Sequence, residues 1–236
     1  MGDSAIDLYY WSTPNGWKVS ILLEELGLPY KVHYINIGAG DQFQKSFLAI
    51  APNNRMPAIV DPDGPEGQPI SIFESGAILQ YLARKHGKFY GGSERQRVAV
   101  DEWLMWQMGG FGPMLGQNHH FNTYAPEDVP YAKQRYTDET HRLYGVLDGR
   151  LAEREFVADE YSIADMAIVG WANGWERQKM DLAEFPNVKR WLDALKARPA
   201  VERGMVLGKE ERAKSAALEE DKGQQAILFG QRARRA

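Results

Sequence analysis

The sequence predicts an α/β domain followed by an all-α domain, and two observations carry that prediction. In the first third of the chain, short β-rich segments alternate with segments whose apolar residues recur at helical spacing. From about residue 93 onward only helical patterns remain. The segment "KHGKFYGG", residues 85–92, separates the two patterns and is the predicted linker. We therefore expect domains at 1–87 and 94–200, followed by a C-terminal extension over 201–236.

The composition limits the functions that the chain can have. With 236 residues, of which 44% are hydrophobic and 25% charged, it can bury an ordinary globular core. A net charge of -4 gives no reason to expect a nucleic acid or a membrane as partner. The chain has no cysteine, which excludes thiolate metal sites and a redox thiol of its own. No membrane span or secretory signal is visible, so we expect a cytoplasmic protein.

The first half of the α/β domain reads as strand, helix, strand. Residues 5–11, "AIDLYYW", form the first predicted strand, which ends at the turn "STPNG". The following helix has apolar residues at i, i+3, i+4 and i+7, namely Val19, Leu22, Leu23 and Leu26. The alternating segment 30–37 predicts the second strand, and a short helix is expected around 43–50. Such a crossover is normally right-handed and makes its two strands parallel.

Two more strands and a helix complete this domain. The segments "PAIVD", residues 57–61, and "ISIF", residues 70–73, are joined by a turn cluster and predict an antiparallel hairpin. Helical spacing returns at Ser75. The order β-α-β followed by β-β-α is the layout of a thioredoxin-like domain.

The second half contains four helical segments. The first, residues 94–110, is expected to break near Gly109–Gly110, and the second spans 128–153. Its candidate core residues are Tyr136, Leu143, Val146 and Leu147. The third opens with Ser162 and has Asp165 three residues later, an acidic variant of the capping box. Pro199 is expected to end the fourth. In the charged C-terminal segment, "QQAILF" could dock on the body, whereas "GQRARRA" is expected to be a loose basic tail.

Three motifs occur in order along the chain: "NRMPAIVD", "ESGAILQYLARK" and "SIADMAI". Together with the two predicted domains they resemble the cytosolic glutathione transferases over about residues 5–200. The stretches "TPNG", "APNNRMPAIVD", "FESGAILQYLA" and "MLGQNHHF" are similar to the nu-class transferases, bacterial enzymes with disulfide-bond reductase activity. The resemblance implies the glutathione transferase architecture, a homodimer with its active sites near the subunit interface, and glutathione as co-substrate, bound as one molecule, two molecules or the oxidised form.

Glu74 and Ser75 stand where the third helix begins. A helix N-terminus offers free N–H groups and a positive dipole end, which suit an anion. On the residues alone, Ser75 could equally be a plain N-cap beside a solvated acid. The resemblance implies that Ser75 binds the γ-glutamyl carboxylate of glutathione and that Glu74 pairs with its ammonium group.

The resemblance also assigns the turn before the third strand. It implies a cis peptide bond before Pro57, with the backbone of Met56 pairing with the cysteinyl part of glutathione like an added strand. Pro57 alone could be an ordinary strand-edge proline. Gln42 matches a glutamine that contacts the glycyl end of glutathione, or it is an exposed loop amide. The flanking residues 53–55 are typical of a turn, with ligand contact as the weaker alternative.

The turn "STPNG" lies where the family holds the glutathione sulfur. The Thr13 hydroxyl and the free backbone N–H of Asn15 could both stabilise a thiolate there. Tyr9, Tyr10 and Ser12 are alternative donors, because other transferases place tyrosine, serine or cysteine at this point. The resemblance to the nu class selects Thr13 and Asn15. Without it, the segment could simply be a turn with an asparagine cap.

Arg135 and a histidine pair complete the candidate residues. Arg135 matches an arginine near a second glutathione in the nu class, where it would neutralise a carboxylate. Its alternative is a solvated helix arginine. His119 and His120 are adjacent, so they do not share a helix face, and no third ligand stands at a suitable spacing. We therefore expect no metal site.

The predicted function is glutathione-dependent disulfide-bond reduction, with small-molecule or glutathione-linked disulfides as substrates. Thiol–disulfide exchange needs a thiolate and access to the sulfur, and both can come from glutathione. Two alternatives remain: a conventional transferase or weak peroxidase that uses glutathione on electrophiles, and a non-catalytic binding module of the same fold.

Overall fold

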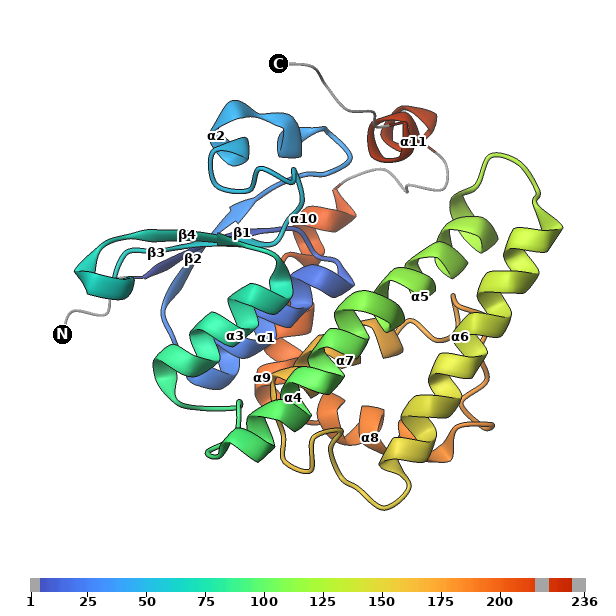
Figure 1. Ribbon diagram of the computed structural model, residues 1–236. Coiled ribbons are helices and arrows are strands. Elements are labelled where there is room, and N and C mark those ends of the chain that lie inside the picture. Colours follow the sequence, from blue (N-terminus) through green and yellow to red (C-terminus); the bar gives the residue numbers. More distant parts are fainter. Residues whose placement is uncertain (1–4, 215–220, 231–236) are drawn as a thin grey trace.

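The computed structural model describes residues 5–214 and 221–230 and shows a sheet domain beside a helical domain (Figure 1). The sheet has four strands in the order β2-β1-β3-β4. Their bounds are β1 (Ile6–Tyr10), β2 (Tyr30–Tyr34), β3 (Ala58–Asp61) and β4 (Ile70–Phe73). Strands β1 and β2 are parallel, whereas β3 runs antiparallel to both of its neighbours. The predicted thioredoxin-like order and its hairpin are confirmed.

The two faces of the sheet are covered by different helices. Side chains alternate along β1, so Leu8 and Tyr10 are buried against helices α1 (Pro14–Leu26) and α3 (Ser75–His86). On the opposite face, Tyr9 packs in a small cluster with Phe47 of α2 (Lys45–Leu48). Figure 1 shows α2 on one side of the sheet and α1 and α3 on the other.

The connection after β2 differs from the predicted one. The strand ends at Tyr34, not at residue 37, because the Asn36 side chain accepts hydrogen bonds from the N–H groups of Gly38 and Ala39 and so forms a turn. The expected helix around 43–50 is two short pieces, η1 (Asp41–Phe43) and α2. This compact loop carries Gln42 toward the cleft between the domains.

The first helical segment does not break at Gly109–Gly110, so that expectation was wrong. Helix α4 (Glu94–Trp106) passes through one π-helical turn, η3 (Gln107–Phe111), into α5 (Gly112–His119). Gln107 and Phe111 are both fully buried and anchor this turn, so the glycine pair stays helical between them. A second π-helical turn, η4 (His120–Tyr124), ends the segment.

Helix α6 (Pro130–Leu151) follows, and its predicted core face is correct for Leu143 and Leu147, which are buried. Tyr136 is half-buried and stacks on Phe121. Val146 is 38% exposed, so its assignment to the core was wrong. Tyr144 is the residue that packs on the buried face of α6 beside Leu143 and Leu147, whereas Val146 lies on the exposed side.

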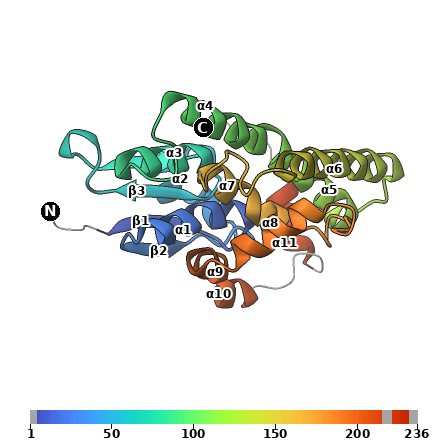
Figure 2. The same ribbon diagram turned by 90° about the horizontal axis from the view of Figure 1, so that it is seen from below.

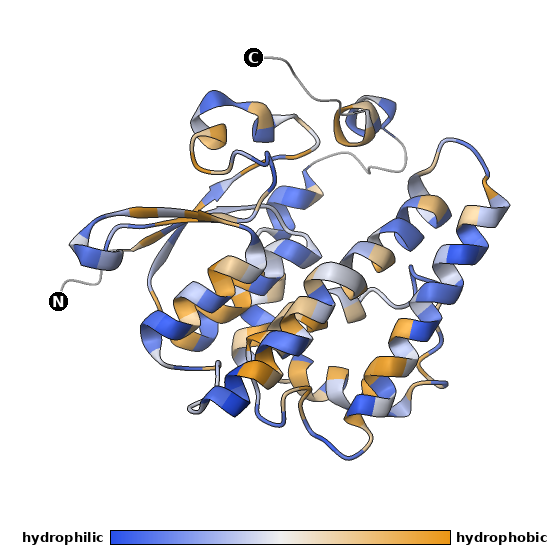
Figure 3. Ribbon diagram, in the orientation of Figure 1, coloured by the Kyte–Doolittle hydropathy of each residue, from blue (hydrophilic) through white to orange (hydrophobic). Residues whose placement is uncertain are grey.

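The remaining helices are α7 (Ile163–Ala172), α8 (Pro186–Lys196), α9 (Pro199–Val206), α10 (Lys209–Ala213) and α11 (Lys222–Phe229). Apart from Asp165, helix α7 has no charged side chain and lies at the centre of the core, and Figure 3 shows hydrophobic residues on the helices around it. The predicted capping box of Ser162 and Asp165 is confirmed. No described helix has the length and the apolar character needed to cross a membrane.

The fourth predicted helix, α8, ends at Lys196 and so does not extend past Pro199, as expected, but Pro199 begins a further helix that the sequence had not suggested. Proline is well tolerated at the first position of a helix, because the N–H that it lacks would have no partner there. The resulting helix α9 packs closely on α1, and the pair can be followed in Figure 2. Gly204 allows this contact, since a Cβ atom there would lie 2.7 Å from the Cα of Ile21.

We expect Gly204→Ala to destabilise the protein by about 1–3 kcal/mol, the usual cost of overpacking a core. The added methyl group would meet the backbone of Ile21, which cannot move without displacing α1. Gly145→Ala is the matched control, because nothing lies within 4 Å of its Cβ position and alanine favours a helix by up to about 1 kcal/mol. Urea unfolding of both variants measures the difference. Equal stabilities would contradict the tight α1–α9 contact.

The segment "QQAILF" lies within α11 and contacts the body of the protein. The ring of Phe229 lies 4.6 Å from that of His120 and 5.8 Å from that of Tyr124, measured between centroids. Gln224 lies close to Gly38. Residues 231–236, most of the predicted basic tail, lie outside the described residues.

Candidate functional site

Two adjoining cavities lie in the cleft between the domains, with volumes of about 500 Å³ and about 680 Å³. The first cavity is lined by most of the predicted site residues: Asn15, Gln42, Met56, Pro57, Glu74 and Ser75. Both cavities share the lining residues Asn15, Arg55, Met108, Leu228 and Phe229. The sequence had not placed the last three at the site. Their role depends on how η3 and α11 fold back onto the first domain.

Helix α1 presents one free amide to these cavities. Thr13 is its N-cap, and the Thr13 Oγ1 atom accepts a hydrogen bond from the Gly16 N–H at 3.2 Å. Pro14 has no N–H, and the Trp17 N–H donates to the Thr13 carbonyl at 2.9 Å. Within the described part of the chain, the Asn15 N–H is therefore the amide of this first turn without an acceptor. It lies at the positive end of the helix dipole.

The Thr13 hydroxyl is a second possible hydrogen-bond donor at the N-terminus of α1. Its closest acceptors are the Trp11 carbonyl at 3.4 Å and the Met56 sulfur at 3.8 Å, both long distances. Thr13 is half-buried and does not itself line either cavity, but Met56, which it contacts, lines the first one. The Thr13 hydroxyl proton is therefore only weakly engaged within the protein.

The three alternative donors, Tyr9, Tyr10 and Ser12, make different contacts. Ser12 is buried, and its Oγ atom accepts a hydrogen bond from Trp17 Nε1 at 3.2 Å. The Tyr10 hydroxyl donates to the Leu207 carbonyl at 3.0 Å, and burial raises the pKa of Tyr10 to about 12. The Tyr9 ring stacks on His33 on the α2 side of the sheet. The Tyr10 proton is thus engaged and Tyr9 lies on the other face of the sheet, whereas Ser12 only accepts a hydrogen bond and stays an alternative donor beside Thr13 and Asn15.

Trp171 orients the Asn15 side chain, a role that the sequence did not suggest. Its Nε1–H donates to Asn15 Oδ1 at 3.0 Å, across the boundary between the domains. Because the indole nitrogen can only donate, the amide oxygen must face it, and the Asn15 NH₂ group faces away. Trp171 itself lines the second cavity.

We expect Trp171→Phe to reduce disulfide turnover about five- to tenfold, in line with the loss of one orienting hydrogen bond. The apolar ring remains, so the free energy of unfolding should change little. Trp175→Phe is the control, because Trp175 lies in the same region of the chain and lines neither cavity. Steady-state kinetics of both variants decides the matter: equal rates would show that the hydrogen bond to Asn15 is dispensable.

The peptide bond between Met56 and Pro57 is cis, as the resemblance implied. Among the described residues, neither the N–H nor the carbonyl of Met56 takes part in a backbone hydrogen bond. Since Met56 also lines the first cavity, its backbone is placed where an extended peptide could pair with it.

Glu74 and Ser75 lie together at the start of α3, but their capping roles differ from the predicted ones. Glu74 occupies the N-cap position with φ 69°, and Ser75 is the first helical residue, so Ser75 does not cap the helix. The Glu74 carboxylate accepts a hydrogen bond from Asn53 Nδ2 at 3.2 Å, which brings that turn residue into the site. Ser75 is buried beneath it.

Gln42 is buried and not an exposed loop amide. Its Nε2 atom donates to the Ile37 carbonyl at 3.0 Å, which fixes the orientation of the amide. Its Oε1 atom has no partner among the described residues and lies in the lining of the first cavity. A buried acceptor of this kind is usually satisfied by water or by a ligand.

Lys18 is a second residue that the sequence did not indicate. It is buried in α1, lines the second cavity, and donates to Gln107 Oε1 at 2.7 Å.

Arg135, by contrast, is exposed on α6 and lines neither cavity, so its contact with a second glutathione stays a prediction. In the part of the chain that the structure describes, no three histidine or acidic residues cluster as metal ligands.

Comparison with known proteins fits this geometry. The family model for the glutathione S-transferase N-terminal domain matches residues 13–85, and that for the C-terminal domain matches residues 118–199. Disulfide-bond oxidoreductase YfcG of Escherichia coli (strain K12) is 52% identical over 197 residues, covering 83% of this chain and 92% of the relative.

Solved structures agree with the fold. A glutathione transferase from Burkholderia graminis, with two glutathione molecules per subunit, is 44% identical with a TM-score of 0.83 and covers 87% of this chain and 89% of its own. One from Pseudomonas putida, with one glutathione disulfide per subunit, has the same identity and TM-score and covers 86% and 91%. The fold and the site thus define a thioredoxin-like protein with an added helical domain. The chain belongs to the glutathione S-transferase family.

Proposed function

We propose that the protein is a glutathione-dependent disulfide-bond reductase. The observation that carries the proposal is that two adjoining cavities meet at Asn15, whose free amide stands beside the Thr13 hydroxyl. Two cavities that share a sulfur-binding point suit two thiol-bearing molecules. The relative YfcG is named a disulfide-bond oxidoreductase, and related structures hold two glutathiones or glutathione disulfide, which supports this assignment.

In the proposed site, the first cavity holds one glutathione along its whole length. Glu74 pairs with the ammonium group and Ser75 with the carboxylate of the γ-glutamyl end. The Met56 backbone pairs with the cysteinyl part, and Gln42 accepts a hydrogen bond from the N–H of the glycyl end. This arrangement delivers the sulfur to Thr13 and Asn15, which stabilise the thiolate over the thiol.

The reaction proceeds by two thiol–disulfide exchanges. The bound glutathione thiolate attacks one sulfur of the substrate disulfide, forms a mixed disulfide and releases the first substrate thiolate. A second glutathione thiolate then attacks the glutathione sulfur of that mixed disulfide and releases the second. Two glutathiones are oxidised to glutathione disulfide, and the substrate takes up two electrons and two protons. The protein contributes no sulfur of its own, consistent with a chain that lacks cysteine.

The test offers the protein glutathione together with either a small disulfide or a chlorinated aromatic electrophile. We expect turnover of the disulfide with formation of glutathione disulfide in equal amount. Turnover of the electrophile alone would favour a conventional transferase. No turnover, combined with no glutathione binding by calorimetry, would favour a binding module.

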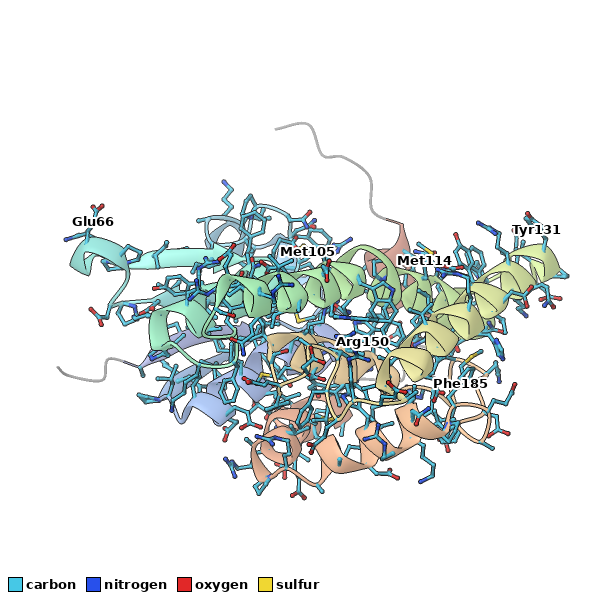
Figure 4. The ribbon with its side chains drawn as sticks, turned by 60° about the horizontal axis from the view of Figure 1, so that its bottom comes forward. Glu66, Met105, Met114, Tyr131, Arg150 and Phe185 are labelled. Atoms are coloured by element: carbon cyan, nitrogen blue, oxygen red, sulfur yellow. The ribbon has the colours of Figure 1, made fainter. Side chains whose placement is uncertain are left out.

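We propose that the protein forms a homodimer. Two features support this: the resemblance to the family, which implies a dimer, and exposed apolar residues on one face of α4. Val98 and Met105 are 49% and 51% exposed and stand seven residues apart, so they share one face of the helix. Figure 4 shows Met105 on the outer side of α4, between Glu66 at the hairpin tip and Tyr131 on α6. Light scattering that gave the 26.7 kDa mass of a single chain would contradict the dimer.

A further inference from the structure

Lys18 is a buried lysine that lines the second cavity, and its Nζ atom lies 3.5 Å from the hydroxyl of Ser75, which lines the first. It is only 2% exposed, and it follows Asn15 by three residues, so both side chains lie on the same face of α1. Lysine is rarely buried in proteins unless it is paired with an opposite charge. The groups around its ammonium nitrogen therefore show whether the protein itself supplies a negatively charged partner.

The ammonium group has only neutral contacts. Its Nζ atom lies 2.7 Å from Gln107 Oε1, 3.2 Å from the Met108 sulfur and 3.5 Å from Ser75 Oγ. In residues 5–214 and 221–230, no carboxylate lies within ion-pair distance of it. A carboxylate bound at Ser75 would come close enough to supply the missing charge.

The other charged groups around the site do not fill this place. Glu74 acts on Lys18 at longer range, and its carboxylate is turned to Asn53. Arg55 and His120 line the second cavity together with Lys18, and neither can supply a negative charge. Burial lowers the pKa of Lys18 to about 7, so a substantial share of the free protein holds it neutral at neutral pH.

We propose that Lys18 is a positioning residue which takes up a proton when glutathione binds, so that its ammonium group neutralises the γ-glutamyl carboxylate held at Ser75. This inference rests on the proposed function, because it assumes that the first cavity binds glutathione. A negative charge beside the amine favours its protonated form, which raises its pKa in the complex. Affinity is then full below the pKa of the free protein and falls as the pH rises toward that of the complex.

The experiment is calorimetry of S-methylglutathione binding at pH 8 in buffers of different ionisation enthalpy. The methylated ligand has no thiol proton, so proton exchange by the sulfur does not contribute. We expect the native protein to take up most of one proton per site. With Lys18→Met the uptake should disappear and the affinity should fall by about tenfold or more, the usual scale for a lost charge-assisted contact.

Two comparisons separate this role from a structural one. Lys31→Met, at an exposed position on β2, should keep both the uptake and the affinity. A ligand that lacks the γ-glutamyl α-carboxylate, S-methyl-γ-aminobutyryl-cysteinyl-glycine, should bind the native protein without proton uptake. Uptake with this ligand would overturn the assignment, and this result does not depend on the folding of any variant.

The remaining outcomes are also decisive. Binding of S-methylglutathione to the native protein without proton uptake would overturn the role of Lys18 and leave the proposed function intact. Uptake that persists in Lys18→Met would do the same. A native protein that does not bind S-methylglutathione at all would overturn the proposed function, and this inference with it.

Discussion

Thr13→Ala is expected to lower disulfide turnover by about ten- to a hundredfold, somewhat below the loss seen when an oxyanion-hole donor is removed, because the Asn15 amide remains. Thr13 offers its hydroxyl proton to the sulfur and also caps α1 by accepting the Gly16 N–H. Glutathione binding should change far less, since the γ-glutamyl and glycyl ends contact other residues. Kinetics with a small disulfide, together with calorimetry of glutathione binding, measures both effects.

Thr13→Ser is the matched control, because serine keeps the hydroxyl and is an equally good N-cap. It should retain most of the activity. Losing the cap in Thr13→Ala costs about 1 kcal/mol of stability, which unfolding experiments measure separately. If Thr13→Ala lowered turnover and binding by the same factor, Thr13 would be part of the scaffold and not a sulfur ligand.

Asp165→Ala is expected to reduce the free energy of unfolding by about 3–5 kcal/mol, because several buried donors lose their acceptor together. The carboxylate is fully buried and accepts the backbone N–H groups of Val157 and Ser162, both at 3.1 Å. It also accepts Trp191 Nε1–H at 2.9 Å. The melting temperature should fall by about 10 °C for a chain of this length.

Asp138→Ala is the control for this prediction. Asp138 is exposed and accepts a single hydrogen bond, from Gln134 on the same helix. Its replacement should change stability by less than about 0.5 kcal/mol, as for most surface substitutions. Urea unfolding followed by tryptophan fluorescence compares the two. A loss of less than about 1 kcal/mol in Asp165→Ala would mean that water satisfies the freed donors.

Much of the first domain could be predicted from the sequence, because its signals are local. The segment at residues 70–73 predicted the bounds of β4, and the turn cluster before it predicted the hairpin, whereas the cis peptide bond before Pro57 was implied by the family resemblance. Most of the predicted site residues line one cavity, because the motifs that carry them sit at strand ends and helix starts. Thr13 and Arg135 are the two predicted site residues that line neither cavity.

The errors occurred where one residue type fits two local structures. Proline suits the first turn of a helix as well as the residues after its end, so Pro199 was correctly expected to follow the end of α8, but the start of α9 at the same residue was missed. Serine favours the N-cap position, so an N-cap was one of two interpretations of Ser75, but the preceding Glu74 adopts the unusual φ and occupies that position. Gly109 and Gly110 would break an isolated helix, whereas the buried residues on either side hold this one together.

The residues that the sequence missed depend on contacts between distant segments. Trp171 and Asn15 are 156 positions apart, and Lys18 and Gln107 are 89 apart. No local pattern shows which group the indole N–H of Trp171 will meet. Lys18 follows a glycine and a tryptophan in a helix, where a lysine is normally expected to face solvent.

The hydrogen bond from Trp171 to Asn15 joins the two domains at the site itself, so turnover is expected to depend on their contact. Gly170 lies against Pro14 at the same seam, where a Cβ atom would be 3.1 Å from the proline carbonyl. An excised first domain would therefore keep its groups for glutathione but lose the indole that orients the Asn15 side chain. A denaturant concentration that separates the two domains should abolish turnover while the sheet is still folded. The catalytic rate should therefore fall at a lower denaturant concentration than the secondary structure does.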